Sequence, residues 1–274
     1  MKRHSNDGMK FRYSRLSAII KPAFSELRKS RKPLRIPHNT FDVQSTDGVK
    51  LFCTRFGNEP GTAIIVAHAA LGGSYYGYAR ALAEELANSF SVLAFDFRGH
   101  GRSTGRCPLG FQKPSEDLEA VVHRAREMGF EKLGVAGFSL GAAAGFLLAG
   151  RRPSFDAFVS IGCPPEFPEM ELWSRRPWLT RAFARSMGIR MVLTPDGGPA
   201  PVDIAWRLPP IPKLLIFGEW EVASPEEISE FVAKVSLPKE TITIPGVWHA
   251  DLGGREATVR KWFDRALEPV TRTE

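Results

Sequence analysis

Residues 132–150 read KLGVAGFSLGAAAGFLLAG, and this stretch predicts the fold of the chain around it. An apolar run typical of a buried strand leads into GFSLG at 137–141, a match to the pattern Gly-x-Ser-x-Gly, and an Ala- and Leu-rich segment typical of a helix follows. A serine on so sharp a turn has a strained backbone, and only small flanking residues let the strand and the helix approach closely. Ser139 is therefore the candidate nucleophile.

The sequence on both sides of this stretch alternates between strand and helix patterns. Short apolar runs predict buried strands at residues 62–69, 91–97, 155–162, 214–217 and 241–244. Amphipathic runs predict helices at residues 74–87, 114–128, 228–235 and 256–267. This alternation predicts an α/β fold with a mostly parallel, doubly wound sheet, right-handed crossovers and helices on both faces.

Two segments depart from the alternation. Residues 41–56 contain two alternating runs about Asp47-Gly48, which predicts an N-terminal β-hairpin. Between residues 163 and 212 the chain becomes rich in proline, and only residues 171–187 have a helical pattern there.

Positive charge gathers at the start of the chain. Residues 1–38 hold eleven Lys and Arg against Asp7 and Glu26, whereas the net charge of all 274 residues is +7, so the rest of the chain is slightly acidic. This body lacks the basic stripe that nucleic-acid binding requires. Apolar residues recur at helical spacing within residues 10–35, which predicts a basic amphipathic helix. The sequence leaves open whether this leader packs on the body, makes peripheral contact with an anionic membrane or is disordered.

The cysteines and the apolar runs bear on cofactors and location. Cys53, Cys107 and Cys163 are scattered and lack CxxC spacing, so neither a disulfide framework nor a zinc site is predicted. No metal and no organic cofactor is implied. No run approaches the ~20 apolar residues of a membrane span, and the leader lacks the apolar core of a signal peptide. A cytoplasmic protein is expected, with peripheral membrane contact as the alternative.

A serine nucleophile needs a base within hydrogen-bond reach, and that base needs a third group to orient it. Among the six histidines, His249 follows the strand pattern near the C-terminus and comes after Ser139 in chain order. His68 and His100 adjoin glycine- and alanine-rich loops and are interpreted as structural. His249 is the candidate base.

Five segments in this order resemble the α/β-hydrolase superfamily of serine esterases and lipases over residues 41–268: VAHAALGGS at 66–74, DFRGHGRS at 96–103, GFSLG at 137–141, FGEWEVASP at 217–225 and GVWHADL at 246–252. The resemblance implies a Ser-acid-His triad. Gly218, Glu221 and Pro225 stand in register with the superfamily's usual Gly-x-x-Asp-x-x-x-Pro, which makes Glu221 the implied acid.

The resemblance leaves some site residues open. Glu219 and Glu166 are alternative acids, Glu166 because some relatives carry the acid after an earlier strand. The backbone N–H groups of Ala70 and Leu140 are implied to form the oxyanion hole, although the chain has His68-Ala69 where the superfamily often has His-Gly. Asp96, Arg98 and His100 are interpreted as a structural turn beside the site.

The proline-rich segment falls where the superfamily inserts a cap, after the sixth strand. The implied division is a leader over 1–38, a core over 39–163 and 212–270, and a cap over 164–211. The pocket candidates are Leu71, Trp173, Trp178, Phe183 and Met187; the alternative role of the cap residues among them is to anchor a lid to the body.

The predicted function is a serine hydrolase that cleaves a carboxylic ester or thioester of a small molecule through an acyl-enzyme. The alternative is a binding protein or receptor that keeps the fold with negligible turnover. A substrate cannot be chosen from the fold, because one fold supports many activities.

Overall fold

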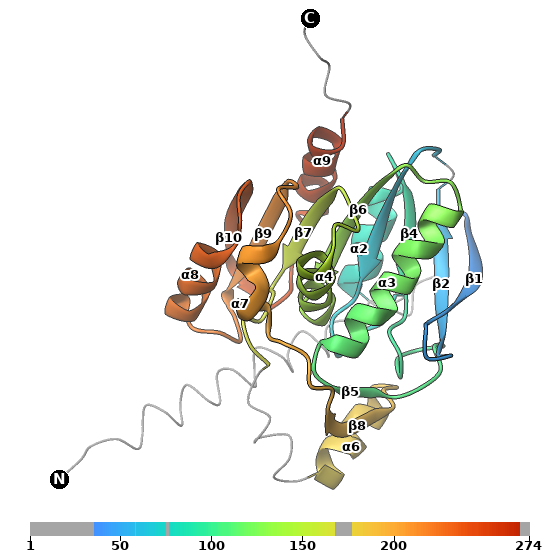
Figure 1. Ribbon diagram of the computed structural model, residues 1–274, viewed down its shortest axis with the longest axis vertical. Helices are drawn as coiled ribbons and strands as arrows, with labels where there is room; N and C mark the ends of the chain where they lie inside the picture. The colour runs from blue at the N-terminus through green and yellow to red at the C-terminus, as the bar shows by residue number, and fades with distance from the viewer. Residues whose placement is uncertain (1–35, 58, 75–76, 168–176, 269–274) are drawn as a thin grey trace, which may run out of the picture.

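The structure is a computed structural model that describes residues 36–57, 59–74, 77–167 and 177–268 (Figure 1). The helix predicted over residues 10–35 and the pocket candidate Trp173 lie outside these residues. Within the described part of the chain, no helix has both the length and the apolar character needed to cross a membrane.

The core is one mixed sheet with the strand order β1-β2-β4-β3-β6-β7-β9-β10. The contacts of β2 with β1 and β4 are antiparallel, and every other contact in the sheet is parallel. The strands are β1 His38–Gln44, β2 Lys50–Phe56, β3 Thr62–Ala67, β4 Ser91–Phe95, β6 Lys132–Phe138, β7 Ala157–Ile161, β9 Lys213–Trp220 and β10 Lys239–Trp248. The mostly parallel sheet with an N-terminal hairpin is confirmed.

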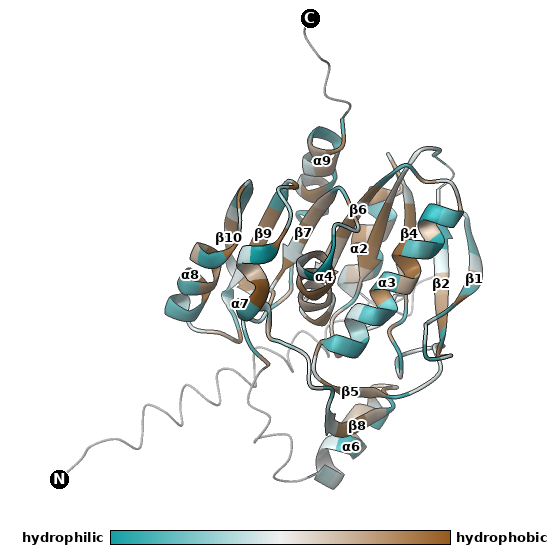
Figure 2. Ribbon diagram, viewed as in Figure 1, coloured by the Kyte–Doolittle hydropathy of each residue, from teal (hydrophilic) through white to brown (hydrophobic). Residues whose placement is uncertain are grey.

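Helices cover both faces of this sheet. On one face lie α3 Gln112–Glu127, α4 Leu140–Arg151 and α8 Pro225–Lys234, and on the other lie α2 Gly77–Leu86 and α9 Glu256–Ala266 (Figure 1). Each face has its own apolar cluster: Phe146, Phe158 and Phe231 pack together on the first, and Leu82 and Phe263 belong to the second. In Figure 2 the inner strands are brown along much of their length, whereas the outward side of α3 is teal. Burial on both faces explains why the inner strands are continuous apolar runs.

The hairpin turns at the position that the sequence predicts. Gly48 has φ +81°, a backbone conformation that residues other than glycine rarely adopt. The Ser45 N–H donates to the Val49 carbonyl at 2.8 Å. The turn brings Asp47 close to α3, where it takes part in an ion-pair network described below.

The proline-rich segment contains more structure than the sequence predicts. It holds α6 Pro177–Ser186, β8 Met191–Pro195, α7 Pro201–Ile204 and a 3₁₀ turn at Ala205–Arg207. The helix predicted over 171–187 is described from residue 177 onward. Strand β8 pairs in parallel with β5, Cys107–Leu109, in a separate two-stranded sheet. Neither strand is predicted by the sequence, because such short strands, with a proline within or at the end of each, leave no readable alternation.

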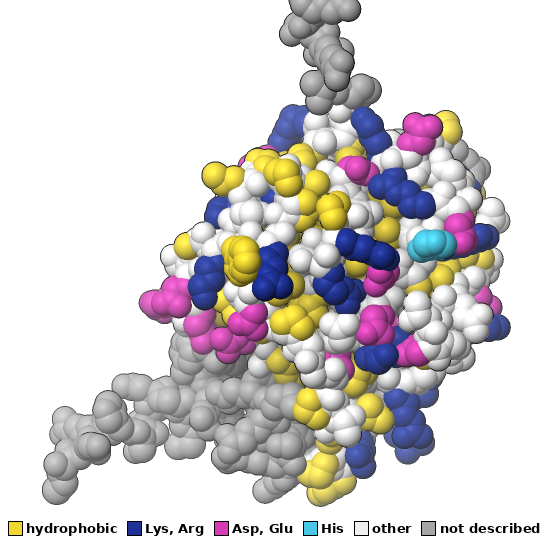
Figure 3. Space-filling view, in the orientation of Figure 1, with side chains coloured by type: hydrophobic (Ala, Val, Ile, Leu, Met, Phe, Trp, Pro, Cys, Tyr) yellow, Lys and Arg dark blue, Asp and Glu magenta, His cyan; other side chains and the backbone are white. Residues whose placement is uncertain are grey.

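The segment rests on the loop that follows β4. Arg190 N–H donates to the Gly99 carbonyl at 2.7 Å, and Asp196 N–H donates to the Leu109 carbonyl at 3.0 Å. The division into core and cap at residues 164 and 211 stays a prediction. The face of the molecule in Figure 3 mixes positive and negative side chains, as expected for a body with little net charge.

Candidate active site

Ser139 occupies a strained turn between β6 and α4. Its backbone has φ 48° and ψ −103°, and its N–H donates to the Ile161 carbonyl at 2.8 Å. A Cβ atom at Gly137 would lie 2.4 Å from the Gly141 carbonyl carbon, and one at Gly141 would lie 2.2 Å from the Ala67 oxygen. Both glycines are therefore required by close backbone approach, which holds the strained serine in place.

The structure brings the three predicted triad residues together. His249 lies directly after β10, and its Nε2 is 2.8 Å from Ser139 Oγ. Its Nδ1 is hydrogen-bonded to Glu221 Oε2, and the His249 and Glu221 side chains are only 8% and 4% exposed. A carboxylate only accepts hydrogen bonds, so Nδ1 carries a proton, and in the neutral ring Nε2 is free to accept from the serine hydroxyl.

Glu221 is held at both carboxylate oxygens. While Oε2 faces His249, Oε1 accepts from the Gly218 N–H at 2.8 Å. The two alternative acids lie elsewhere. Glu219 Oε2 accepts from the Gly246 N–H at 2.7 Å, and Glu166 is exposed to solvent. Among the described carboxylates, Glu221 alone bonds the His249 ring.

The two predicted oxyanion donors are both available. Leu140 is the first residue of α4, where a helix leaves N–H groups without an intrahelical partner and its dipole favours negative charge. Neither the Leu140 amide nor the Ala70 amide donates a hydrogen bond to another described residue. The placement is compatible with the predicted pair of donors beside Ser139.

Two buried histidines hold the loop that carries Ala70. Phe97 N–H donates to His68 Nε2 at 2.9 Å, so the opposite nitrogen, Nδ1, donates to the Ala69 carbonyl at 2.7 Å. His100 Nε2 is 2.7 Å from the Ala70 carbonyl. Burial, followed by the neighbouring His100, lowers the pKa of His68 to about 4, so this ring is neutral near pH 7. The contacts match the structural role interpreted for both histidines.

Asp96 joins the same loop to the turn after β4. Its Oδ1 accepts from both the N–H and the hydroxyl of Ser74, at 2.7 and 2.8 Å, and its Oδ2 accepts from the Arg102 N–H at 3.0 Å. A Cβ atom at Gly101 would lie 2.2 Å from the carboxylate. The aspartate and glycine of the DFRGHGRS segment therefore form one packed unit.

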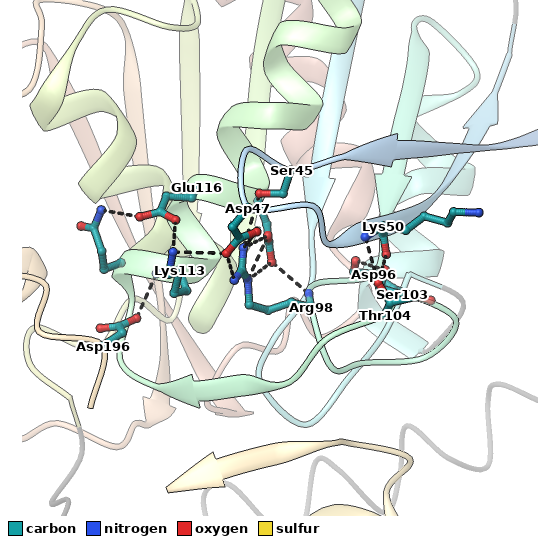
Figure 4. A network of polar contacts seen from close by, with 12 residues as sticks. Ser45, Asp47, Lys50, Asp96, Arg98, Ser103, Thr104, Lys113, Glu116 and Asp196 are labelled. Carbon is teal, nitrogen blue, oxygen red and sulfur yellow. Dashed lines mark hydrogen bonds and ion pairs between the residues drawn. The ribbon is translucent and has the colours of Figure 1, made fainter. Parts of the chain in front are cut away.

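Arg98 is the centre of an ion-pair network (Figure 4). Its guanidinium pairs with Asp117 of α3 and with Asp47 of the hairpin turn, both at 2.7 Å, and Lys113 reaches Asp47 at 3.2 Å. The hydrogen bond from Arg98 holds the pKa of Asp47 well below its usual range, whereas burial raises that of Asp117. Sequence reasoning predicts a turn at Asp47 but not its ion pair with Arg98, and it missed Asp117, which stands in no recognisable motif.

The pocket candidates have mixed surroundings. Trp178 is 68% exposed on α6, whereas Leu71, Phe183 and Met187 are half-buried. An indole so open to solvent is not enclosed by the rest of the structure, so the substrate-pocket role of these residues stays a prediction.

The cysteines and the metal-binding side chains offer no second site within the described residues. Cys53, Cys107 and Cys163 are buried free thiols, and burial raises the pKa of each. No group of three or more His, Cys, Asp or Glu side chains in the described ranges is arranged to hold a metal ion.

The chain is similar in sequence and in structure to known proteins. A family model of the alpha/beta hydrolase fold matches residues 62–185. An esterase from Pyrococcus furiosus is 22% identical, with a TM-score of 0.70 over 86% of this chain and 93% of its own. A thermophilic esterase from Thermogutta terrifontis is 17% identical, with a TM-score of 0.66 over 83% of this chain and 99% of its own.

The similarity extends to a peptidase. A proline iminopeptidase from Mycobacterium smegmatis is 17% identical, with a TM-score of 0.59 over 83% of this chain and 98% of its own. No curated protein matches the chain significantly. At such identities likeness establishes architecture and not substrate. The chain has the alpha/beta hydrolase fold. This conclusion rests on the sheet, the strained Ser139 turn, the matching family model and these solved structures.

Proposed function

We propose that this protein is a serine hydrolase that cleaves a carboxylic ester or thioester of a small molecule. The hydrogen-bonded series from Ser139 through His249 to Glu221 supports the proposal most directly. Two of the similar solved structures are esterases, which favours an ester over an amide.

In the first half of the reaction, Ser139 Oγ attacks the acyl carbon while its proton moves to His249 Nε2. Glu221 keeps the ring in the tautomer that accepts this proton and stabilises the imidazolium that forms. The tetrahedral intermediate collapses to an acyl-serine, and the departing alcohol or thiol takes the proton from Nε2.

In the second half, water attacks the acyl-serine and gives one proton to His249 Nε2. Collapse of the second intermediate returns that proton to Ser139 Oγ and releases the carboxylic acid. In both halves the oxyanion accepts hydrogen bonds from the Ala70 and Leu140 amides; such donors typically contribute roughly 2.7–4 kcal/mol each to the transition state. The reaction needs no metal and no cofactor.

The test is covalent labelling with a fluorophosphonate probe, followed by turnover of nitrophenyl esters and thioesters of graded chain length. Ser139→Ala should abolish labelling and lower kcat by several orders of magnitude, because only binding and the oxyanion donors then remain. Ser154→Ala is the matched control, since that hydroxyl bonds the Arg152 carbonyl just beyond the C-terminal end of α4, whereas Ser139 precedes the N-terminal end.

The outcomes separate the enzyme from its rival. Labelling with turnover supports the hydrolase. Labelling without turnover of any ester or thioester would favour a binding protein on the same fold, and near-normal turnover by Ser139→Ala would rule out the mechanism.

A further inference from the structure

The strand that leads to His249 is interrupted just before it. Strands β9 and β10 pair in parallel register as far as Gly218 and Ile244, and the register resumes only at Trp220 and Trp248. Between these two points β10 has three residues, 245–247, opposite a single residue of β9, which is Glu219. His249 therefore follows shortly after a bulge at residues 245–247, across which the ladder does not fix the backbone.

The side chain of Glu219 supplies a bond across this interruption. Pro245 has no N–H, and the Gly246 N–H donates to Glu219 Oε2 at 2.7 Å. Gly246 has φ +74°, a conformation that glycine adopts readily, so the backbone departs here from the extended conformation of the strand. The carboxylate thus makes the bond to the middle of the bulge that a ladder partner would otherwise make.

Packing around the bulge brings the acid and base segments close together. A Cβ atom at Gly218 would lie 2.8 Å from the Val247 carbonyl oxygen and 2.7 Å from that of Trp248. The rings of Trp220 and Trp248 pack against each other with their planes tilted by 41° and their centroids 4.7 Å apart. These cross-strand contacts therefore join residues 218–221 to residues 246–249.

We propose that Glu219 is a positioning residue for His249, which it fixes by accepting the hydrogen bond of the Gly246 amide across the bulge in β10. The proposal rests on the hydrolase function above. It gives the two glutamates at the C-terminal end of β9 different tasks: Glu221 bonds the His249 ring, and Glu219 fixes the backbone that carries that ring.

The distinguishing property of this task is that it needs an acceptor oxygen and not a charge. Glu219→Gln keeps an oxygen that can accept from the Gly246 N–H, whereas Glu219→Ala does not. If Glu219 instead acted on the His249 ring through its negative charge, both variants would lose that effect. Glu230→Ala is the control, since this exposed carboxylate of α8 makes no hydrogen bond to a described residue.

The experiment measures kcat, KM and the pH profile for one activated ester in the full-length chain. We expect Glu219→Ala to lower kcat about tenfold with KM nearly unchanged, because a displacement on the order of 1 Å at a reacting group costs up to ~10²-fold. Glu219→Gln should restore kcat to within about twofold of wild type, with the same pH profile. Equal loss in the two variants, or none in Glu219→Ala, would overturn the proposal.

Amide hydrogen exchange tests the hydrogen bond between the Gly246 N–H and Glu219, here called the clamp, in an experiment that needs no turnover. Peptides that cover residues 245–249 should exchange faster in Glu219→Ala than in wild type, and at the wild-type rate in Glu219→Gln and Glu230→Ala. If wild type neither labels nor turns over esters, the hydrolase proposal fails while this exchange pattern still reports on the clamp. Unchanged exchange in Glu219→Ala would overturn the clamp and leave the hydrolase proposal standing.

Discussion

Glu221 uses the full length of its side chain. It bonds the His249 ring with one carboxylate oxygen and accepts from the Gly218 N–H of the preceding strand, β9, with the other. Both partners are donors, so the position demands two acceptor oxygens. Aspartate, which is more usual at this position in the resembling superfamily, would have to be brought closer by its loop.

We expect the order of kcat to be wild type, then Glu219→Gln, then Glu221→Asp, then Glu221→Gln. Aspartate keeps both acceptors but falls short of the imidazole, whereas glutamine turns an NH₂ group toward one of the two donors. The measurement is kcat on one activated ester, with thermal melts to confirm folding. An unimpaired Glu221→Gln would show that the ring does not depend on this carboxylate.

The proximity of the triad side chains could be predicted from residue order, because Ser139, Glu221 and His249 each follow an apolar run of a parallel sheet and such ends meet at one edge. The bond from Glu219 to Gly246 could not be predicted, since it depends on a bulge whose place in the register no periodicity reveals. The ion pair between Asp117 and Arg98 could not be predicted either, because the two residues meet only when α3 packs beside the loop after β4.

At the scale of elements, the crossing of β6 and α4 depends on backbone proximity. Gly141 lies against the Ala67 carbonyl of β3, whereas a Cβ atom at Gly150, near the other end of α4, would meet the Ile204 side chain at 3.1 Å. A side-chain methyl can move aside, but a strand carbonyl in the centre of a sheet cannot. Two glycines of one helix should therefore respond unequally to the same substitution.

Gly141→Ala should lower the free energy of unfolding by about 3 kcal/mol or more, at the upper end of overpacking costs, and reduce ester turnover. Gly150→Ala should stay within ~1 kcal/mol of wild type, because the helix gains intrinsic propensity while Ile204 adjusts. Urea denaturation of both variants makes the comparison. Similar stability for the two would contradict the close approach at Ala67.

Long elements could be predicted and short ones could not. The inner strands and α3, α4 and α9 carry enough apolar periodicity to be recognised, whereas β5 and β8 pair over so few residues that only their tertiary neighbours define them. Their presence beside the loop after β4 is a property of how the proline-rich segment folds back onto the core.

At the scale of the whole molecule, a buried lysine links stability to pH. Lys213 begins β9 with 1% exposure, and its Nζ donates to the Pro209 and Ile211 carbonyls at 2.9 and 2.8 Å. Burial and then the charge of Lys239 lower the pKa of Lys213 from 10.5 to about 8. A neutral amine still has two N–H donors for these two carbonyls, so it loses little on deprotonation.

The sign of this linkage follows from the lowered pKa. Below pH 8 both the folded and the unfolded chain carry the charge, and folding bears the full cost of burying it. Between about pH 8 and 10.5 the folded chain releases the proton that the unfolded chain keeps, so stability rises. The Tm of wild type relative to Lys213→Met should therefore increase from pH 7.5 to 10 in thermal melts. A constant difference would show that Lys213 does not titrate in this range.

The wide separation of Ser139 and His249, 110 residues apart in sequence, gives the molecule a temporal order. During synthesis the Ser139 turn between β6 and α4 leaves the ribosome long before β10 has been made, and N-terminal segments fold first. By the proposed mechanism, a growing chain that has Ser139 but not yet His249 lacks the base that ester cleavage requires. We expect Ser139 to become reactive only when the edge strand β10 has paired with β9. Covalent probe labelling of ribosome-stalled chains of increasing length would therefore report when folding is complete.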